Sequence, residues 1–111
     1  MPVEFKAENR SLTAALSGEI DHHTAADIRI STDGELERLT PETLVFDMSK
    51  VTFMDSSGIG LILGRARLMQ AWGGKVKVSR PSERADKILR LSGLGALIAD
   101  SDTKKGARRD A

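Results

Sequence analysis

The sequence predicts a single α/β domain in which a mixed, mostly parallel β-sheet is packed by helices in the order β-β-α-β-α-β-α. Segments typical of strands alternate with segments whose apolar residues recur every three or four positions, as on one face of a helix. One strand-like segment, residues 43–48, is a nearly continuous apolar run, which is typical of a central strand covered on both faces. Strands that alternate with helices favour parallel pairing and right-handed crossovers.

The chain is predicted to begin with a β-hairpin. Residues 3–7 and 11–17 have the alternation of short strands, and Asn9 with Arg10 forms a candidate turn between them. Residues 18–21, Gly-Glu-Ile-Asp, are then expected to break the second strand.

The first helix is predicted from residue 22 to about residue 39. Asp21 is a suitable N-cap, and Thr-Pro at 40–41 ends the helix. The stretch 31–34 contains a glycine, which predicts a kink or fraying there. The residues at helical spacing on the inward face are Ala25, Ile28, Thr32, Leu36 and Leu39.

The strand at 43–48 leads through residues 49–54 to a second helix. This helix is predicted from Ser56 or Ser57 to Trp72, and Gly-Gly at 73–74 stops it. Its inward residues are Ile59, Ile62, Leu63, Ala66 and Met69.

The remaining elements are shorter. Residues 75–79 predict a strand, and a third helix opens at residues 81–82 and runs through residue 91. Residues 94–99 fit either a final helical turn or a short strand. The inward residues of the third helix are Ala85, Ile88, Leu89 and Leu91.

Length and composition predict one soluble cytoplasmic domain. The 111 residues suit a single domain, assigned here to residues 3–100, followed by a basic tail at 101–111 that lacks periodicity. The net charge of +1 provides no overall field for DNA or a membrane surface. Neither a signal peptide nor a membrane-spanning stretch is expected, and the absence of cysteine suits a reducing compartment.

Two strand-to-helix turns are expected to lie close together in space. One covers residues 18–23 and the other residues 51–60, and both follow strands at the carboxyl edge of the sheet. Open α/β sheets bind their ligands and partners at this edge.

The sequence Asp55-Ser56-Ser57-Gly58 in the second turn allows three interpretations. Asp55 or Ser56 could cap the helix. A phosphate on Ser56 would also be tolerated there, because a helix N-terminus favours negative charge. The third interpretation is the nucleophile elbow of a serine hydrolase, but Met54 occupies the position of the glycine that precedes the nucleophile in that motif.

Other kinds of site are disfavoured. The glycines at 58, 60 and 64 lack the Gly-Lys-Ser/Thr ending of a nucleotide-binding loop. His22 and His23 are adjacent on a helix, where side chains point about 100° apart, and so do not chelate a metal together. No cofactor or metal is therefore predicted.

A partner surface is suggested on the second helix. Leu61 and Leu68 fall off the main apolar stripe, beside Arg65. An exposed apolar strip with a neighbouring arginine is typical of a protein-binding helix.

Two segments resemble the signature sequences of the anti-sigma factor antagonists, which are STAS domains. They are GEIDHHTA at 18–25 and FMDSSGIGLILGR at 53–65, followed at the expected spacing by GGKVKV and LRLSGL. The resemblance covers about residues 3–100 and is strongest to the sporulation-type antagonists of the forespore sigma system.

The resemblance implies a non-enzymatic protein that switches partners. Such proteins bind an anti-sigma factor that is also an ATP-dependent serine kinase, and binding frees the sigma factor. The kinase phosphorylates the first serine of Asp-Ser-Ser-Gly, here Ser56, and the complex no longer holds. A PP2C-type phosphatase resets the protein.

By the same resemblance and the pattern above, eight residues are expected to contact the partner. They are Glu19, Asp21, His22, Asp55, Ser57, Gly58, Leu61 and Arg65. A stress-response antagonist with another kinase, and a small serine hydrolase that uses a histidine base, remain as alternatives.

Overall fold

The structure is a computed structural model and describes residues 2–99. Its elements follow the predicted order. Among the described residues, no helix is both long enough and apolar enough to cross a lipid bilayer. The basic tail lies outside them. The elements are β1 (Val3–Glu8), β2 (Ser11–Ile20), α1 (His22–Leu39), β3 (Thr43–Met54), α2 (Ser56–Ala71), β4 (Lys75–Ser79), α3 (Glu83–Leu91) and the 3-10 turn η1 (Gly95–Leu97).

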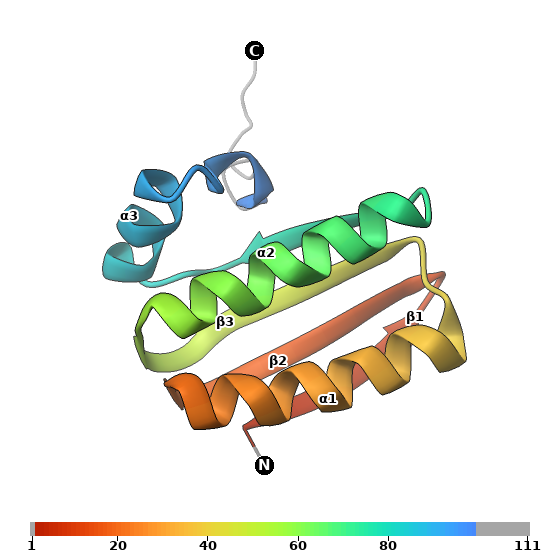
Figure 1. Ribbon diagram of the computed structural model, residues 1–111, viewed down its shortest axis with the longest axis horizontal. Helices are drawn as coiled ribbons and strands as arrows, with labels where there is room; N and C mark the ends of the chain where they lie inside the picture. Colours follow the sequence, from red (N-terminus) through yellow and green to blue (C-terminus); the bar gives the residue numbers. More distant parts are fainter. Residues whose placement is uncertain (1, 100–111) are drawn as a thin grey trace.

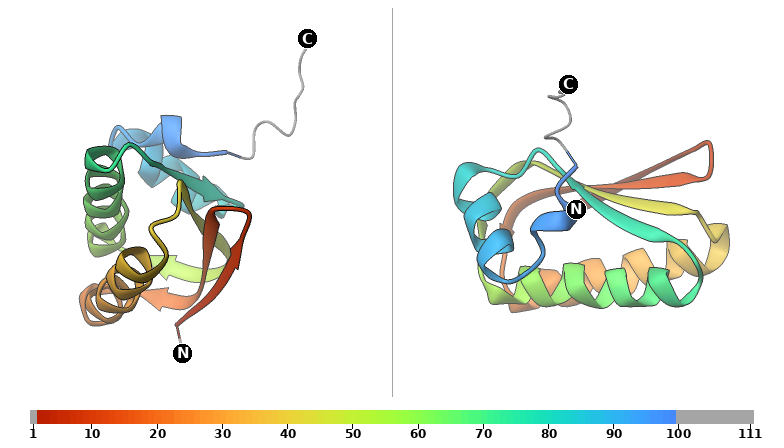
Figure 2. Two further views of the ribbon diagram at one scale, coloured as in Figure 1. Left: turned by 90° about the vertical axis from the view of Figure 1, so that its right-hand side faces the viewer. Right: turned by 90° about the horizontal axis from the view of Figure 1, so that it is seen from above.

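The four strands form one sheet in the order β1-β2-β3-β4. β1 pairs with β2 antiparallel, whereas β2 with β3 and β3 with β4 are parallel. α1 and α2 lie side by side on one face of this sheet, and α3 lies near the beginning of α2 (Figures 1 and 2). The predicted mixed, mostly parallel sheet is therefore confirmed.

The hairpin turn is formed by Asn9 and Arg10, as predicted. Glu8 pairs with Ser11, so the connection is two residues long. Both turn residues have positive φ, 52° and 65°. Two-residue hairpin turns of this kind match the right-handed twist of the flanking strands.

The break in the second strand was expected at residues 18–21, but this is wrong for residues 18–20, because β2 continues to Ile20. Gly18 adopts a φ of 78°, and the register with β3 shifts between Gly18 and Glu19. A β-bulge absorbs the irregularity that the glycine introduces without ending the strand. As a result Ile20 pairs with Met54, the last residue of β3.

The core fills the space between the sheet and the helices. Phe46, Ile28, Ile62 and Leu89 are fully buried and come from four different elements. α1 continues without interruption through residues 31–34, so the fraying considered there as an alternative to a kink is wrong.

Leu91 was expected to face inward but is 79% exposed. It follows Leu89 by two residues, which rotates it about 200° around α3 and away from the core. The segment after α3 combines both predicted forms. η1 makes a short helical turn, and Ile98 then forms a parallel bridge with Val78.

Candidate functional site

The two predicted turns meet at one edge of the sheet. Ile20 and Met54 are paired, and the backbone N–H of Asp55 donates to the carbonyl oxygen of Ile20 at 3.2 Å. α1 and α2 consequently begin at the same edge (Figure 1). The prediction that residues 18–23 and 51–60 are neighbours is confirmed.

Aspartates cap both helices at this edge. Oδ1 of Asp55 accepts a hydrogen bond from the N–H of Ser57 at 2.8 Å. Oδ1 of Asp21 accepts from the N–H and the hydroxyl of Thr24, at 3.0 and 2.9 Å. Of the two candidate caps of α2, the structure therefore assigns Asp55, and the Ser56 hydroxyl is not used for capping.

The hydrogen bonds at the α1 cap change the acidity of Asp21. The N–H of Thr24, followed by its hydroxyl, stabilises the carboxylate and lowers the pKa of Asp21 below its usual value. A smaller contribution comes from the charge of His23. This cap is consequently a fixed negative group beside the start of α2.

The two serines of the loop have different environments. Ser56 is exposed and is the first residue of α2, whereas Ser57 is partly buried. A group transferred to the Ser56 hydroxyl would therefore meet solvent on one side and the positive end of the α2 dipole on the other. That arrangement can accept a phosphate without disturbing the core.

Gly58 allows the loop to approach the sheet closely. The residue is buried, and a Cβ at this position would overlap Cγ of Met54 and lie 2.5 Å from its Sδ. Only glycine leaves room for Met54 beneath the first turn of α2. Gly58 thus shapes the loop from within and is not on its outer surface.

The predicted exposed strip on α2 is wrong. Leu61 is 4% exposed and belongs to the core. The Arg65 side chain is 11% exposed, and its Nε lies 2.9 Å from Oδ1 of Asp33 on α1. α2 packs against the neighbouring helix as well as the sheet, so its buried face is wider than one stripe.

The two histidines at the start of α1 lie against each other. His22 and His23 are both exposed, and their ring centroids lie 4.1 Å apart, so the rings contact each other and do not point apart as expected. Among residues 2–99, no side-chain hydrogen bond joins either histidine to Ser56. In the same part of the chain, no group of three or more potential ligand side chains is placed to hold a metal ion.

Phe53 lies close to this site in the chain and was not singled out from the sequence. It pairs across the strands with Glu19, and both side chains are exposed. The guanidinium of Arg84, at the start of α3, lies 5.9 Å from the centre of the Phe53 ring. Alternation in β3 was the available signal, because Met54 faces inward and its neighbour must face outward.

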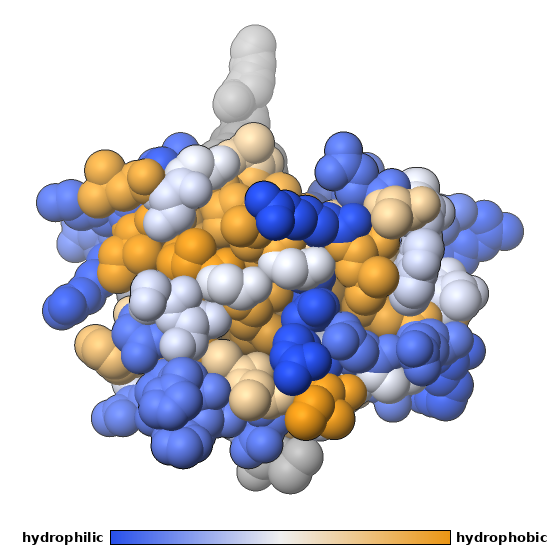
Figure 3. All heavy atoms as spheres, in the orientation of Figure 1, coloured by the Kyte–Doolittle hydropathy of each residue, from blue (hydrophilic) through white to orange (hydrophobic). Residues whose placement is uncertain are grey.

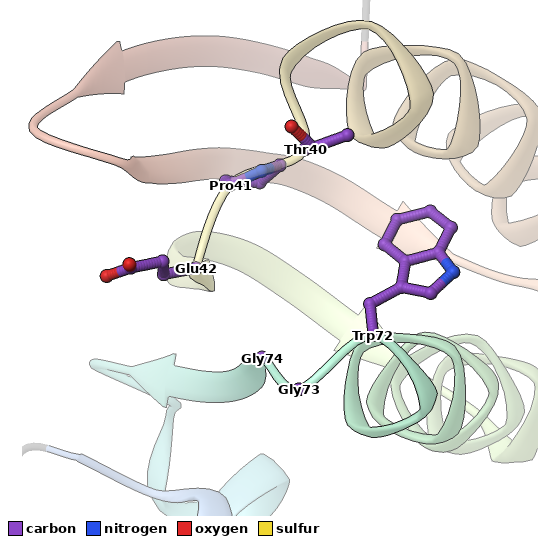
Figure 4. A pocket seen from close by; sticks show the side chains of 6 residues that line it. All are labelled: Thr40, Pro41, Glu42, Trp72, Gly73 and Gly74. Atoms are coloured by element: carbon purple, nitrogen blue, oxygen red, sulfur yellow. The ribbon is translucent and has the colours of Figure 1, made fainter.

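A separate groove lies at the opposite end of the domain. It has a volume of about 300 Å³ and is lined by Thr40, Pro41, Glu42, Trp72 and the glycine pair at 73–74. The indole of Trp72 projects from the end of α2 beside the opening (Figure 4). This groove is not part of the Ser56 site.

The chain matches the STAS domain over residues 3–107 and belongs to that family. It is 34% identical over 107 residues to the anti-sigma F factor antagonist of Paenibacillus polymyxa, covering 96% of this chain and 92% of the relative. It is 28% identical over 109 residues to the anti-sigma-B factor antagonist of Bacillus subtilis (strain 168), covering 94% of each.

Solved structures of the anti-sigma factor antagonist SpoIIAA show the same fold. Its unphosphorylated form is 30% identical, with a TM-score of 0.79 over 98% of this chain and 87% of that chain. The Bacillus cell fate determinant SpoIIAA in the phosphorylated form is 30% identical, with a TM-score of 0.73 over 98% and 90%.

Proposed function

We propose that this STAS domain is an anti-sigma factor antagonist whose binding is switched by phosphorylation of Ser56. The unphosphorylated protein binds an anti-sigma factor that is also a serine kinase, and the sigma factor is released. The relatives' names support the antagonist role. The exposed Ser56 at the start of α2, with Asp55 already in the capping position, is the observation that supports the switch.

The phosphoryl transfer requires little of this chain beyond presenting the hydroxyl. Oγ of Ser56 attacks the γ-phosphorus of ATP bound to the kinase, and the bond to the β–γ bridging oxygen breaks. ADP leaves with that oxygen, and the hydroxyl proton passes to a base of the kinase. Because the Ser56 hydroxyl is exposed and does not cap the helix, it can enter a kinase active site without unfolding of α2.

The phosphate would switch binding off by changing the surface that the partner contacts, while the fold of the domain stays the same. It adds a charge of about −1.5 to −2 next to Asp55 and close to the Asp21 cap. The α2 dipole tolerates this charge within the domain. A partner fitted to the unmodified hydroxyl meets added bulk and like-charge crowding, which weakens the complex. A PP2C-type phosphatase would restore the binding form.

The test is to incubate the protein with its cognate anti-sigma kinase and ATP and to map the phosphorylated residue. We expect one phosphate on Ser56 of the wild type and on a Ser57→Ala control, and none on Ser56→Ala. Ser56→Ala should also remain bound to the kinase after ATP is added. Modification elsewhere, or equal release of Ser56→Ala and wild type, would contradict the proposal.

The choice of sigma system is a separate part of the proposal. The forespore system of sporulation is favoured, and it implies a cytoplasmic protein. The similarity to an anti-sigma-B factor antagonist supports a different anti-sigma kinase as the second candidate. Capture of the kinase from the native host with Ser56→Ala as bait, followed by identification of the sigma factor it inhibits, decides between them.

A further inference from the structure

We infer that Phe53 is an aromatic anchor for the anti-sigma kinase and inserts into an apolar recess of that partner beside its active site. This inference rests on the proposed function and adds to it a contact that the Asp-Ser-Ser-Gly loop does not supply. Phe53 is 42% exposed, although it belongs to a strand whose next residue, Met54, is 5% exposed. Aromatic residues, phenylalanine among them, are enriched at protein interfaces relative to the rest of the surface.

The position of Phe53 in the chain keeps it close to Ser56. Phe53 is three positions before Ser56, which limits their Cα atoms to a distance of at most about 11 Å. A standard interface buries about 800 Å² on each partner, equivalent to a disc of radius about 16 Å. Phe53 therefore lies within reach of an interface centred on the Ser56 hydroxyl.

Trp72 offers a contrast on the same protein. It is 47% exposed, which is similar to Phe53, but it follows α2 at the other end. Sixteen residues of helix separate it from Ser56, or about 24 Å along the axis. It lies outside that disc, in the groove of Figure 4.

The residues around Phe53 indicate which groups the partner's recess should contain. Glu19 is its neighbour across the strands, and Arg84 covers one part of the ring. An aromatic side chain between groups of opposite charge has the organisation of an interface core with a polar rim. The matching surface is an apolar recess with a basic group opposite Glu19 and an acidic group opposite Arg84.

The end of β3 that carries Phe53 also lies against α3. Elsewhere, on the face that carries the helices, apolar side chains are visible over α2 and toward α3, with hydrophilic side chains around them (Figure 3). A small recess of about 50 Å³ lies between the end of β3 and α3, lined in part by Phe53, Arg84 and Ile88. The anchor is thus supported from behind by α3, so that docking requires little reordering.

The experiment measures the affinity of the unphosphorylated protein for its cognate anti-sigma kinase, with a nonhydrolysable ATP analogue bound. Phe53→Ala is compared with Trp72→Ala, which removes a similarly exposed aromatic ring. We expect Kd to rise about 10- to 30-fold for Phe53→Ala and less than threefold for Trp72→Ala. In the phosphorylation assay, KM should rise for Phe53→Ala while kcat stays near the wild-type value, because Ser56 itself is unchanged.

Each outcome separates the anchor from the proposed function. Equal affinities of the two alanine variants, with the wild type still binding, would overturn the anchor and leave the switch standing. An absence of wild-type binding would instead contradict the proposed function. If Phe53→Ala does not fold, Phe53→Thr, which introduces a residue with a high strand propensity, gives the same comparison. Glu19→Lys and Arg84→Glu should each weaken binding as well, and unchanged Kd values for both would overturn the assigned rim.

Discussion

At the scale of single residues, the loop at residues 55–58 depends on the carboxylate of Asp55 and on the absence of a side chain at Gly58. Asp55 takes the cap of α2, so Ser56 is available at the surface. The sequence could not choose between Asp55 and Ser56 as the cap, because both types are good N-caps. The backbone conformation decides which residue is the cap. Asp55 is extended, as an N-cap residue is, and its N–H donates to the carbonyl oxygen of Ile20 at the end of β2.

Gly58 gives a prediction about side-chain size. Gly58→Ala should lower the free energy of unfolding by about 1–3 kcal/mol, because the new methyl group overlaps the buried Met54 side chain. Gly60→Ala is the matched control, with no atom within 4 Å of its added Cβ. That control should be neutral or stabilising by up to about 1 kcal/mol. Urea denaturation measures both, and an equal effect of the two substitutions would contradict the packing argument.

At the scale of elements, the start of α1 is sensitive to pH through Asp21. Hydrogen bonds from Thr24 lower the pKa of Asp21 in the folded protein below the usual 3.8. Between the two pKa values the unfolded state binds more protons, so the stabilisation is complete above about pH 3.8 and is lost as pH falls through the folded value.

Asp21→Asn tests this dependence, because asparagine caps a helix but carries no charge. The wild type should melt above the variant at pH 7, and the difference should shrink below pH 3.8. Asp27→Asn, at an exposed position later on α1, is the control. A wild-type advantage that persists unchanged at pH 2.5 in thermal unfolding would show that the Asp21 charge does not act through the cap.

The contact between α1 and α2 includes an ion pair that the sequence did not predict. Nε of Arg65 and Oδ1 of Asp33 lie 2.9 Å apart, without the alignment of a hydrogen bond. Burial lowers the pKa of Arg65, and the Asp33 carboxylate opposes that effect. Each group therefore compensates the burial of the other.

Arg65→Met should destabilise the protein by about 1–3 kcal/mol, because it leaves Asp33 without its counter-charge at the helix interface. Adding Asp33→Asn should recover part of that loss. Arg67→Met, at an exposed position on the same helix, should change stability by less than about 0.5 kcal/mol. Chemical denaturation of the single and double variants measures the coupling, and additive effects would argue against the ion pair.

At the scale of the whole molecule, the domain boundary remains a prediction from sequence. Residues 101–111 have no apolar periodicity, so a chain that ends at residue 100 should retain the full core. We expect the truncated and complete chains to differ by less than about 0.5 kcal/mol in unfolding free energy. A larger loss of unfolding free energy on truncation would show that the folded domain includes part of residues 101–111.

The sequence by itself determined the order of elements and the junction at Asp55, because periodicity, caps and turns are local. The turn at Asn9 and Arg10 and the helix from residue 22 are examples. Local patterns could not show that β2 continues through Gly18, since pairing with β3 compensates for the glycine.

Only the tertiary structure decided which faces of α2 are covered. Leu61 and Arg65 lie off the apolar stripe, yet both are largely buried, because α1 packs beside α2 while the sheet lies beneath it. The neighbours of Phe53 were likewise decided by the tertiary structure, because the pairing of β2 with β3 places Glu19 beside it and α3 brings Arg84 to its ring. A helix or strand period identifies one inward face, but the number of neighbours that cover an element depends on long-range packing.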